Sequence, residues 1–298
     1  MKLFVAGSLN MDLVIRAPRI PEQGMTLTGD GFFMNPGGKG ANQAVAAAKL
    51  GADAYMVGAV GNAFGEELLA ALRGYGVDTR FVARREDVPS GIAVIVVVGG
   101  DNRIILDRGA NACADGALIA RALEGAGAGD LLLVQLETGV GFAAEALRQA
   151  KARGMTTLLN PAPALPLPAG VLPLCDYFLP NQTEAQFYTG IYPADEASCR
   201  RCAEALFGQG AKRVLVTLGE AGSVYFSEEE SYRSAAYPVT AVDTTAAGDT
   251  YVAAFAVRRA EGASVPEAMA FASKASALTV TRRGAQQSIP LRAEVDAL

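Results

Sequence analysis

Asp249 follows three small residues at the start of an expected helix, and this stretch is the one best suited to chemistry. A polar, β-branched segment, residues 242–245, leads into Ala246, Ala247 and Gly248. A helix start carries unpaired backbone N–H groups and the positive end of the helix dipole, so it can bind a phosphate. A carboxylate repels a neighbouring phosphate, so its presence here suggests a chemical role such as taking a proton from a hydroxyl. On its own, the stretch is equally compatible with an ordinary helix start that has an acid in its first turn.

A second glycine-rich loop, Asn35 to Gly40, also leads into an expected helix of small residues. Its Gly38-Lys39 pair does not belong to a Walker loop. In such a loop position 33 would be glycine, but it is Phe33, and the residue after the lysine would be Ser or Thr rather than another glycine. The two loops therefore indicate two places where a ligand can approach the backbone closely.

The composition narrows the classes of function. With 298 residues, 51% of them hydrophobic, the chain can bury a large core. It contains no histidine, which excludes Ser-His-Asp triads, histidine bases and histidine-ligated metals, so a general base must be Asp, Glu, Lys, Tyr or Cys. The net charge of −5 argues against general nucleic-acid binding. No apolar run approaches the roughly 20 residues of a membrane helix, and residues 1–7 resemble a strand more than a signal peptide. We therefore expect a cytoplasmic protein with no membrane partner.

Apolar segments alternate with helical segments along most of the chain. This alternation predicts a parallel sheet covered by helices on both faces, with polar residues gathered at the edge where the strands end. The expected strands are 2–7, 55–60, 131–136, 156–159, 177–179 and 213–217. The expected helices or helical fragments are 65–72, 118–123, 143–153, 197–207, 251–259, 265–282 and 292–298.

Two further pairs of alternating segments lie outside this pattern. Segments 13–17 and 26–33 predict one hairpin, and segments 91–98 and 103–107, joined by Gly99 to Asn102, predict another. Two separate hairpins suggest a small β-sheet lid built from insertions at about 13–34 and 88–107. The chain as a whole, residues 1–298, is then expected to form a single domain.

The Cys199-Arg200-Arg201-Cys202 segment has the spacing of a redox or zinc motif. Its surroundings have helical periodicity, with both cysteines on the face of Leu206, and no second such pair exists to complete a zinc site. We expect these cysteines to pack in the core.

The two glycine loops, in the order in which they occur along the chain, resemble the signatures of the phosphofructokinase-B-type sugar kinases. The resemblance runs from Val5 to about Pro290, and the Gly-Gly-Lys-Gly-Ala-Asn-Gln-Ala form is most similar to the ribose-phosphorylating branch of that family. It implies a three-layer α/β sandwich with a mostly parallel central sheet and a small β-sheet lid. Ala246 replaces the usual glycine, which preserves the backbone N–H. Residues 127–130 spell the family's Gly-Ala-Gly-Asp, but they lie between an expected helix and an expected strand, so we interpret them as a turn.

The resemblance also implies roles for single residues. Asp249 would deprotonate a sugar hydroxyl that attacks the γ-phosphate of ATP, and the N–H groups of Ala246, Ala247 and Gly248 would hold the developing charge. Residues expected to contact the sugar are Asn10, Asp12, Gly38, Lys39, Asn42 and Glu137. Residues expected near the nucleotide are Asn181, Thr217, Gly219, Gly222 and Ser273. Glu184, with Asn181, would set Mg²⁺, often through water. Residues expected around a monovalent cation such as K⁺ are Asp243, Thr245, Thr279, Arg282, Gly284 and Ser288.

Most of these residues also have a plain structural interpretation. Asn181 and Glu184, three apart, form the pattern of a helix cap. Asp12 and Glu137 are also compatible with surface acids at strand ends, and Asp243 with an ordinary loop acid. The glycines at 219 and 222 are equally typical of a turn.

The resulting functional expectation is ATP-dependent phosphorylation of a sugar hydroxyl, first of all of D-ribose to ribose 5-phosphate. Alternatives are a kinase for deoxyribose, another sugar or a nucleoside, and a non-catalytic sugar or nucleotide sensor on the same scaffold. A nucleoside needs a flat apolar slot, yet the lid strands offer only Phe32 and Phe33, which as neighbours on a strand point to opposite faces. The resemblance implies a homodimer formed through the lid. Gln23-Gly24-Met25-Thr26 departs from the family's common Pro-Gly-Glu-Thr, which leaves the details of lid closure open.

Overall fold

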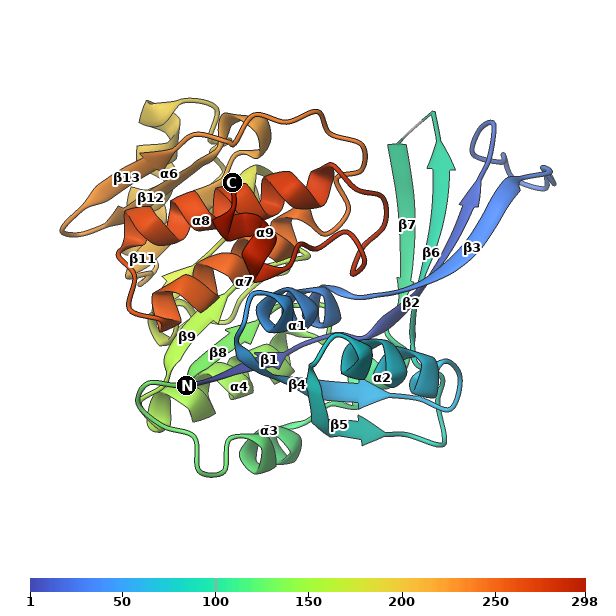
Figure 1. The fold of residues 1–298 in the computed structure, drawn as a ribbon, viewed down its shortest axis with the longest axis horizontal. Coiled ribbons are helices and arrows are strands. Elements are labelled where there is room, and N and C mark those ends of the chain that lie inside the picture. The colour runs from blue at the N-terminus through green and yellow to red at the C-terminus, as the bar shows by residue number, and fades with distance from the viewer. Residues whose placement is uncertain (100) are drawn as a thin grey trace.

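The computed structural model describes residues 1–99 and 101–298, and within these ranges its main sheet has nine strands (Figure 1). In spatial order they are β13 (Ser231–Ser234), β12 (Ser223–Ser227), β11 (Arg213–Thr217), β10 (Tyr177–Phe178), β9 (Thr156–Leu159), β8 (Leu131–Val134), β1 (Lys2–Ala6), β4 (Asp53–Val60) and β5 (Asp78–Arg84). Neighbours from β11 to β5 pair in parallel, and β12 and β13 add an antiparallel edge. The predicted mostly parallel sheet is confirmed.

Three strands of this sheet were not predicted. β5 carries a charged residue at both ends and lies at one edge, where its side chains are mostly half-exposed. β12 and β13 form a hairpin at the other edge, joined through a turn of acidic residues. Edge strands lack the continuous apolar run that identifies a buried parallel strand, so the pattern used for the central strands does not detect them.

The helices agree with the expected alternation. They are α1 (Lys39–Lys49), α2 (Gly65–Gly74), α3 (Gly116–Ala122), α4 (Val140–Ala152), α5 (Gln182–Thr189), α6 (Glu196–Gly208), α7 (Ala247–Ala260), α8 (Val265–Val280) and α9 (Arg292–Asp296). Short 3₁₀ turns lie at Gly109–Cys113, Leu172–Leu174 and Gly219–Ala221. α7 begins four residues earlier than the expected 251–259, so Asp249 lies inside its first turn.

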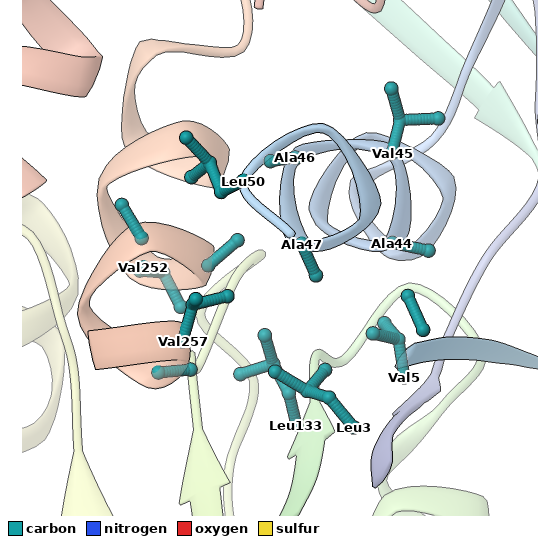
Figure 2. Close-up of a cluster of buried hydrophobic side chains, with 14 of the residues drawn as sticks. Leu3, Val5, Ala44, Val45, Ala46, Ala47, Leu50, Leu133, Val252 and Val257 are labelled. Atoms are coloured by element: carbon teal, nitrogen blue, oxygen red, sulfur yellow. The ribbon is translucent and has the colours of Figure 1, made fainter. Parts of the chain in front are cut away.

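The helices form a layer on each face of the sheet, because side chains alternate along each strand. In β1, Leu3 and Val5 point into one buried cluster, and Phe4 and Ala6 point into the other. Figure 2 shows part of the first cluster: Leu3 and Val5 lie on the side of the small α1 residues Ala44 and Ala47, and Val257 of α7 lies beside Leu3. α1 and α7 therefore pack side by side on one face, which brings the starts of the two glycine-loop helices together (Figure 1).

A separate four-stranded sheet stands beside the main sheet (Figure 1). Its order, within the described residues, is β3 (Asp30–Gly37), β2 (Asn10–Arg16), β6 (Gly91–Val98) and β7 (Asp101–Asp107). Both predicted hairpins exist, and β2 pairs with β6 in parallel to join them. The bounds of two strands were wrong: β3 runs from Asp30 to Gly37 rather than over residues 26–33, and β2 already begins at Asn10. Of the turn expected from Gly99 to Asn102, Asp101 and Asn102 belong to β7, and residue 100 lies outside the described residues.

Two motif-like segments have the structural roles that were expected. Residues 127–130 form a turn between α3 and β8, in which Asp130 N–H donates to Gly127 O (3.0 Å) and its carboxylate accepts from Gly127 N–H (3.2 Å). Cys199 and Cys202 lie on the buried face of α6 as free thiols. No group of three potential metal-binding acids or cysteines occurs in the part of the chain that the structure describes. Among these residues, no helix has the length and apolar character needed to cross a membrane.

Candidate active site

The candidate base lies at the N-terminus of α7 and is buried. Asp249 is 8% exposed, and each carboxylate oxygen accepts a hydrogen bond: Oδ1 from Gln43 Nε2 (2.9 Å) and Oδ2 from Asn42 Nδ2 (3.0 Å). Both donors come from the first two turns of α1, 206 and 207 residues away in sequence. The packing of α1 against α7 therefore builds this end of the site.

The three small residues before Asp249 present their N–H groups unequally. Ala246 is the N-cap of α7 with φ +60°, a left-handed conformation that costs an alanine about 1–2 kcal/mol. The Ala247 N–H donates to Thr244 O at 3.2 Å. The N–H groups of Ala246 and Gly248 have no protein acceptor within the described ranges. Two of the three expected donors are thus free for an anion, and the third is shared with the preceding turn.

Glu137 joins the expected sugar-contacting residues. It follows β8, and its Oε2 accepts from Ser8 Oγ (2.5 Å), from the backbone N–H of Lys39 (3.0 Å) and from Asn10 Nδ2 (3.3 Å). Asn10, at the start of β2, is in turn oriented by Asn111, whose Nδ2 donates to Asn10 Oδ1 at 2.8 Å. Glu137 therefore ties the end of β1, the start of β2 and the start of α1 to one point.

Asp12 lies two residues after Asn10 on β2, against the glycine loop. A Cβ at Gly37 would lie 2.3 Å from Asp12 Oδ2, so the loop needs glycine there to pass this carboxylate. Burial, together with the nearby charges of Glu137 and Asp249, raises the pKa of Asp12 to about 7. Burial lowers the pKa of Lys39, but the carboxylates of Asp249, Glu137 and Glu184 outweigh it, so the net pKa shift is upward and Lys39 stays charged. One lysine thus faces several carboxyl groups in a confined space.

A cavity of about 250 Å³ joins Lys39 and Asp249 to the expected nucleotide side, whereas Asn10, Asp12, Asn42 and Glu137 do not line it. Lys39, Asn160 and Asp249 line it together with Glu184 and the N-cap residue Ala246. A larger hollow of about 300 Å³ lies elsewhere, beside α6 and the β12–β13 turn, and contains none of the expected site residues.

Asn181 and Glu184 form a complete capping box at the start of α5. Asn181 Oδ1 accepts from Glu184 N–H (2.8 Å), and Glu184 Oε2 accepts from Asn181 N–H (2.8 Å). The structural interpretation of this pair is therefore correct. It does not remove the pair from the site, because both residues also line the cavity. Burial raises the pKa of Glu184 to about 6.

The other expected nucleotide residues lie around the end of β11. Thr217 ends that strand and lines the cavity, and Asn181 forms a parallel bridge to it. Gly222 has φ +88°, and a Cβ there would lie 2.0 Å from Ser234 O, so its glycine is required by the fold. Ser273 accepts from Tyr237 N–H (3.1 Å) and donates to Ala235 O (3.0 Å), which holds the chain after β13 against α8. Gly219, with φ +58°, begins a 3₁₀ turn.

The expected cation residues fall into two groups. Asp243 joins two loops: Oδ1 accepts from the N–H (3.0 Å) and hydroxyl (2.7 Å) of Thr245, and Oδ2 accepts from Gly284 N–H (2.9 Å). Burial raises the pKa of Asp243, but these donors outweigh it, so the net pKa shift is downward. The remaining three side chains are engaged elsewhere: the hydroxyls of Thr279 and Ser288 donate to Ala275 O and Ala285 O, and Arg282 pairs with Glu294.

Four residues of the site were not assigned from the sequence: Gln43, Asn111, Gln135 and Asn160. All four are buried amides that bond to other site residues. Signals for two of them were present. Gln135 interrupts an apolar strand segment, and Asn160 follows a buried strand at the ligand-binding edge of the sheet.

The geometry and the comparisons with known proteins agree on the class of protein. The model of the pfkB family of carbohydrate kinases matches residues 1–292, and the chain belongs to this family. It is an ATP-dependent carbohydrate kinase, as the sequence predicted. It is similar to the ribokinase of Schizosaccharomyces pombe, with 41% identity covering 99% of this chain and 97% of the relative. The ribokinase of Haemophilus influenzae is 38% identical over 98% and 96% of the two chains. The structure of Arabidopsis thaliana ribokinase complexed with ribose and ATP superimposes with a TM-score of 0.90, at 33% identity over 99% and 97% of the chains.

Proposed function

We propose that this kinase transfers the γ-phosphoryl group of ATP to a hydroxyl of free D-ribose, giving ribose 5-phosphate and ADP. The observation that carries the proposal is the position of Asp249. It is buried beside free helix N-terminal N–H groups and shares its cavity with Lys39, next to the polar groups of β2 and α1. The relatives named for ribose point to the same substrate. Because the proposed reaction consumes ATP, it also supports the expected cytoplasmic location.

In the proposed reaction, Asp249 accepts the proton of the sugar hydroxyl as the hydroxyl oxygen attacks the γ-phosphorus. The new P–O bond forms to the sugar, the bond to ADP breaks, and ADP leaves with that electron pair. The proton on Asp249 is then released to solvent. The free N–H groups of Ala246 and Gly248, and the charge of Lys39, stabilise the negative charge of the transferred group. Here catalysis rests on positioning and electrostatics, which explains why one carboxylate and small residues suffice.

The sugar would be held by a polar set that needs several hydroxyls as partners. Asn10, Asp12, Lys39, Asn42 and Glu137 belong to this set, as does the backbone at Gly38. Within the described part of the chain, Asn42 Oδ1 is buried and has no hydrogen-bond partner, and a sugar hydroxyl would provide one. A missing hydroxyl leaves such groups unpaired, so ribose should be preferred over 2-deoxyribose.

The nucleotide would lie along the end of β11, near Thr217, Gly219, Gly222 and Ser273. Of these, Thr217 and the capping pair Asn181–Glu184 line the cavity. Mg²⁺ keeps most of its waters and needs few carboxylates, so the single buried carboxylate of Glu184 fits it. When bound, the ion would neutralise phosphate charge. Glu184 would hold it through water and keep its capping bonds.

The monovalent cation would lie between the two loops that Asp243 joins. The side chains of Thr279, Arg282 and Ser288 are occupied, so we propose that K⁺ is held mainly by backbone carbonyl oxygens of these loops. Asp243, Thr245 and Gly284 would keep the loops together. Since residues 244–246 lead directly into α7, an ordered loop would fix the N–H groups that face the phosphate.

We also propose that the four-stranded sheet, insertions 13–34 and 88–107, is a lid on a single kinase domain and forms the interface of a homodimer. Its strands β3, β6 and β7 carry large apolar side chains that are at least 41% exposed: Phe32, Phe33, Met34, Val94, Ile104, Ile105 and Leu106. Ile105 is 73% exposed. Strand pairing places Phe32, Met34, Val94 and Ile105 on one face of the sheet and the other three side chains on the opposite face. An exposed apolar face such as the first is typical of an interaction surface. A second copy is the proposed occupant, since both copies would cover the same patch.

The decisive experiment compares kcat/KM for ribose, 2-deoxyribose, fructose and adenosine with ATP under one set of conditions, together with Asp249→Asn. Ribose should give the highest value, and Asp249→Asn should keep ATP binding while lowering kcat by roughly 10²–10⁴-fold. A higher value for deoxyribose or adenosine would overturn the substrate. A variant that keeps more than about a tenth of kcat would remove Asp249 as the base. Absence of ADP formation with every sugar would instead favour a sensor.

A further inference from the structure

A chain of buried side-chain amides connects the candidate base to the central sheet. Gln43 Nε2 donates both to Asp249 Oδ1 (2.9 Å) and to Asn160 Oδ1 (3.0 Å), while Gln43 Oε1 accepts from Gln135 Nε2. Asn160 continues the chain by donating from Nδ2 to Leu179 O at 2.9 Å. Gln43 and Gln135 are fully buried. None of these amides has a part in the phosphoryl transfer described above.

The chain has a direction, because an amide donates at one end and accepts at the other. Gln135 places a donor at Gln43 Oε1, and Asn160 places an acceptor at Gln43 Nε2. Both contacts require the NH₂ group of Gln43 to face Asp249. A reversed Gln43 would point its oxygen at the carboxylate and its NH₂ group at the donor of Gln135. In a buried site each such mismatch is costly.

The fold makes room for this chain at Gly7, directly after β1. A Cβ on Gly7 would lie 2.0 Å from Gln135 Oε1 and 2.7 Å from the Cα of Gly40. Glycine at this position therefore lets the side chain of Gln135 pass the end of β1 and reach α1. Four segments distant in sequence, the ends of β1, β8 and β9 and the start of α1, meet at this point.

We propose that Gln43 is a positioning residue for the base, and that Gln135 acts by fixing the orientation of Gln43. The proposal rests on the proposed role of Asp249. A donor held against Oδ1 favours the ionised carboxylate and keeps it in place, while each oxygen retains a lone pair for the proton of the sugar hydroxyl. Asn42, the other donor to Asp249, is also expected to bind the sugar. Gln43 is the donor whose partners all belong to the protein.

The test replaces each glutamine by methionine, which has a similar length and no hydrogen-bond donor. Gln43→Met and Gln135→Met would be assayed for kcat from pH 5 to 9 at saturating ribose and Mg-ATP. Gln149→Met is the matched control, because Gln149 is a half-buried glutamine on α4 that bonds to Gly116 O and Glu145, away from the site. Asp12, Lys39, Glu137 and Glu184 are the other ionisable groups near Asp249. All four remain in every variant, so differences between variants do not come from their removal.

For Gln43→Met we expect kcat at pH 8 to fall roughly 10- to 100-fold, the value of one hydrogen bond to a charged group. The lower limb of the kcat profile should move to higher pH, because the ionised base has lost a donor. Gln135→Met should shift the limb in the same direction by less, although it does not touch Asp249. KM for ATP should stay within about threefold, and Gln149→Met should match the wild type.

The outcomes separate this inference from the function on which it rests. If Asp249→Asn retains activity, the role of the base falls and the inference falls with it. If Asp249→Asn is inactive while both methionine variants keep the wild-type limb, only the positioning role is wrong. If Gln43→Met fails to fold, as judged by its melting curve, Gln135→Met decides, and a wild-type limb in that variant overturns the proposal.

Discussion

Sugar binding should depend on pH through Asp12. Burial and the charges of Glu137 and Asp249 raise the pKa of this carboxyl group to about 7, from 3.8 in a model compound. If the ionised form binds the sugar hydroxyls, about a tenth of the free enzyme is competent at pH 6, and nearly all of it above pH 8. We therefore expect kcat/KM for ribose to fall about tenfold between pH 8 and pH 6. An aspartate of ordinary pKa would remain ionised throughout this range.

The assay is kcat/KM for ribose from pH 5 to 9, measured for the wild type and for Asp12→Asn. The variant should lose this limb and, at pH 8, bind ribose roughly 10- to 100-fold more weakly, while KM for ATP changes little. Asp30→Asn, an exposed acid on β3 of the same sheet, is the control for the change of charge. A wild-type profile that is flat from pH 6 to 8, or an Asp12→Asn variant that keeps the limb, would refute the assigned role of Asp12.

The raised pKa of Asp12 also affects the stability of the folded protein. The pKa of Asp12 is higher in the folded than in the unfolded chain, so the folded state binds the proton more tightly. Loss of the Asp12 proton therefore lowers the free energy of unfolding as the pH rises from about 4 to 7. Above pH 7 the free energy of unfolding keeps this lower value. Asp12→Asn should raise Tm at pH 8, and by less at pH 5. A variant that loses ribose affinity and gains stability would show a binding residue maintained at a cost to the fold.

Three further predictions concern the loops and the lid. Adding K⁺ to a buffer of large organic cations should raise kcat, and Asp243→Ala should abolish the rise; equal kcat with and without K⁺ would count against a cation site. Ile105→Asp should convert a dimer into a monomer in sedimentation velocity, whereas Phe187→Asp, an exposed apolar residue of α5, should not; an unchanged dimer in Ile105→Asp would place the interface elsewhere. Ala246→Val should lower the free energy of unfolding by more than about 1 kcal/mol and reduce kcat, because a β-branched residue is strained at φ +60°. Ala246→Gly should leave kcat within about twofold. A stable, active valine variant would show that this backbone conformation is not needed.

The central architecture could be predicted because its signals are local. Buried parallel strands are apolar runs, and strands 156–159 and 213–217 were placed at their observed bounds. The turn at 127–130 was separated from the proposed phosphate loop by asking which of the two precedes a helix. The edge strands β5, β12 and β13 carry no such run, so periodicity could not reveal them. The start of β3 was missed for a related reason: alternation continues through residues 26–29, but pairing with β2 begins only at Asp30.

Site residues could be predicted only where the type of the side chain and its position in the sequence indicate a chemical role. Asp249, Lys39 and Glu137 are charged residues beside glycine loops or strand ends, and the structure places all three around one region. Gln43 is adjacent to Asn42 in the same motif, yet nothing in its type or spacing distinguishes a base-orienting amide from a packed one. What distinguishes it is the set of its partners, Gln135, Asn160 and Asp249, which lie 92, 117 and 206 residues away. The direction of an amide is a property of all its neighbours at once, so it can be inferred only after the fold has brought α1, α7 and the ends of β8 and β9 together.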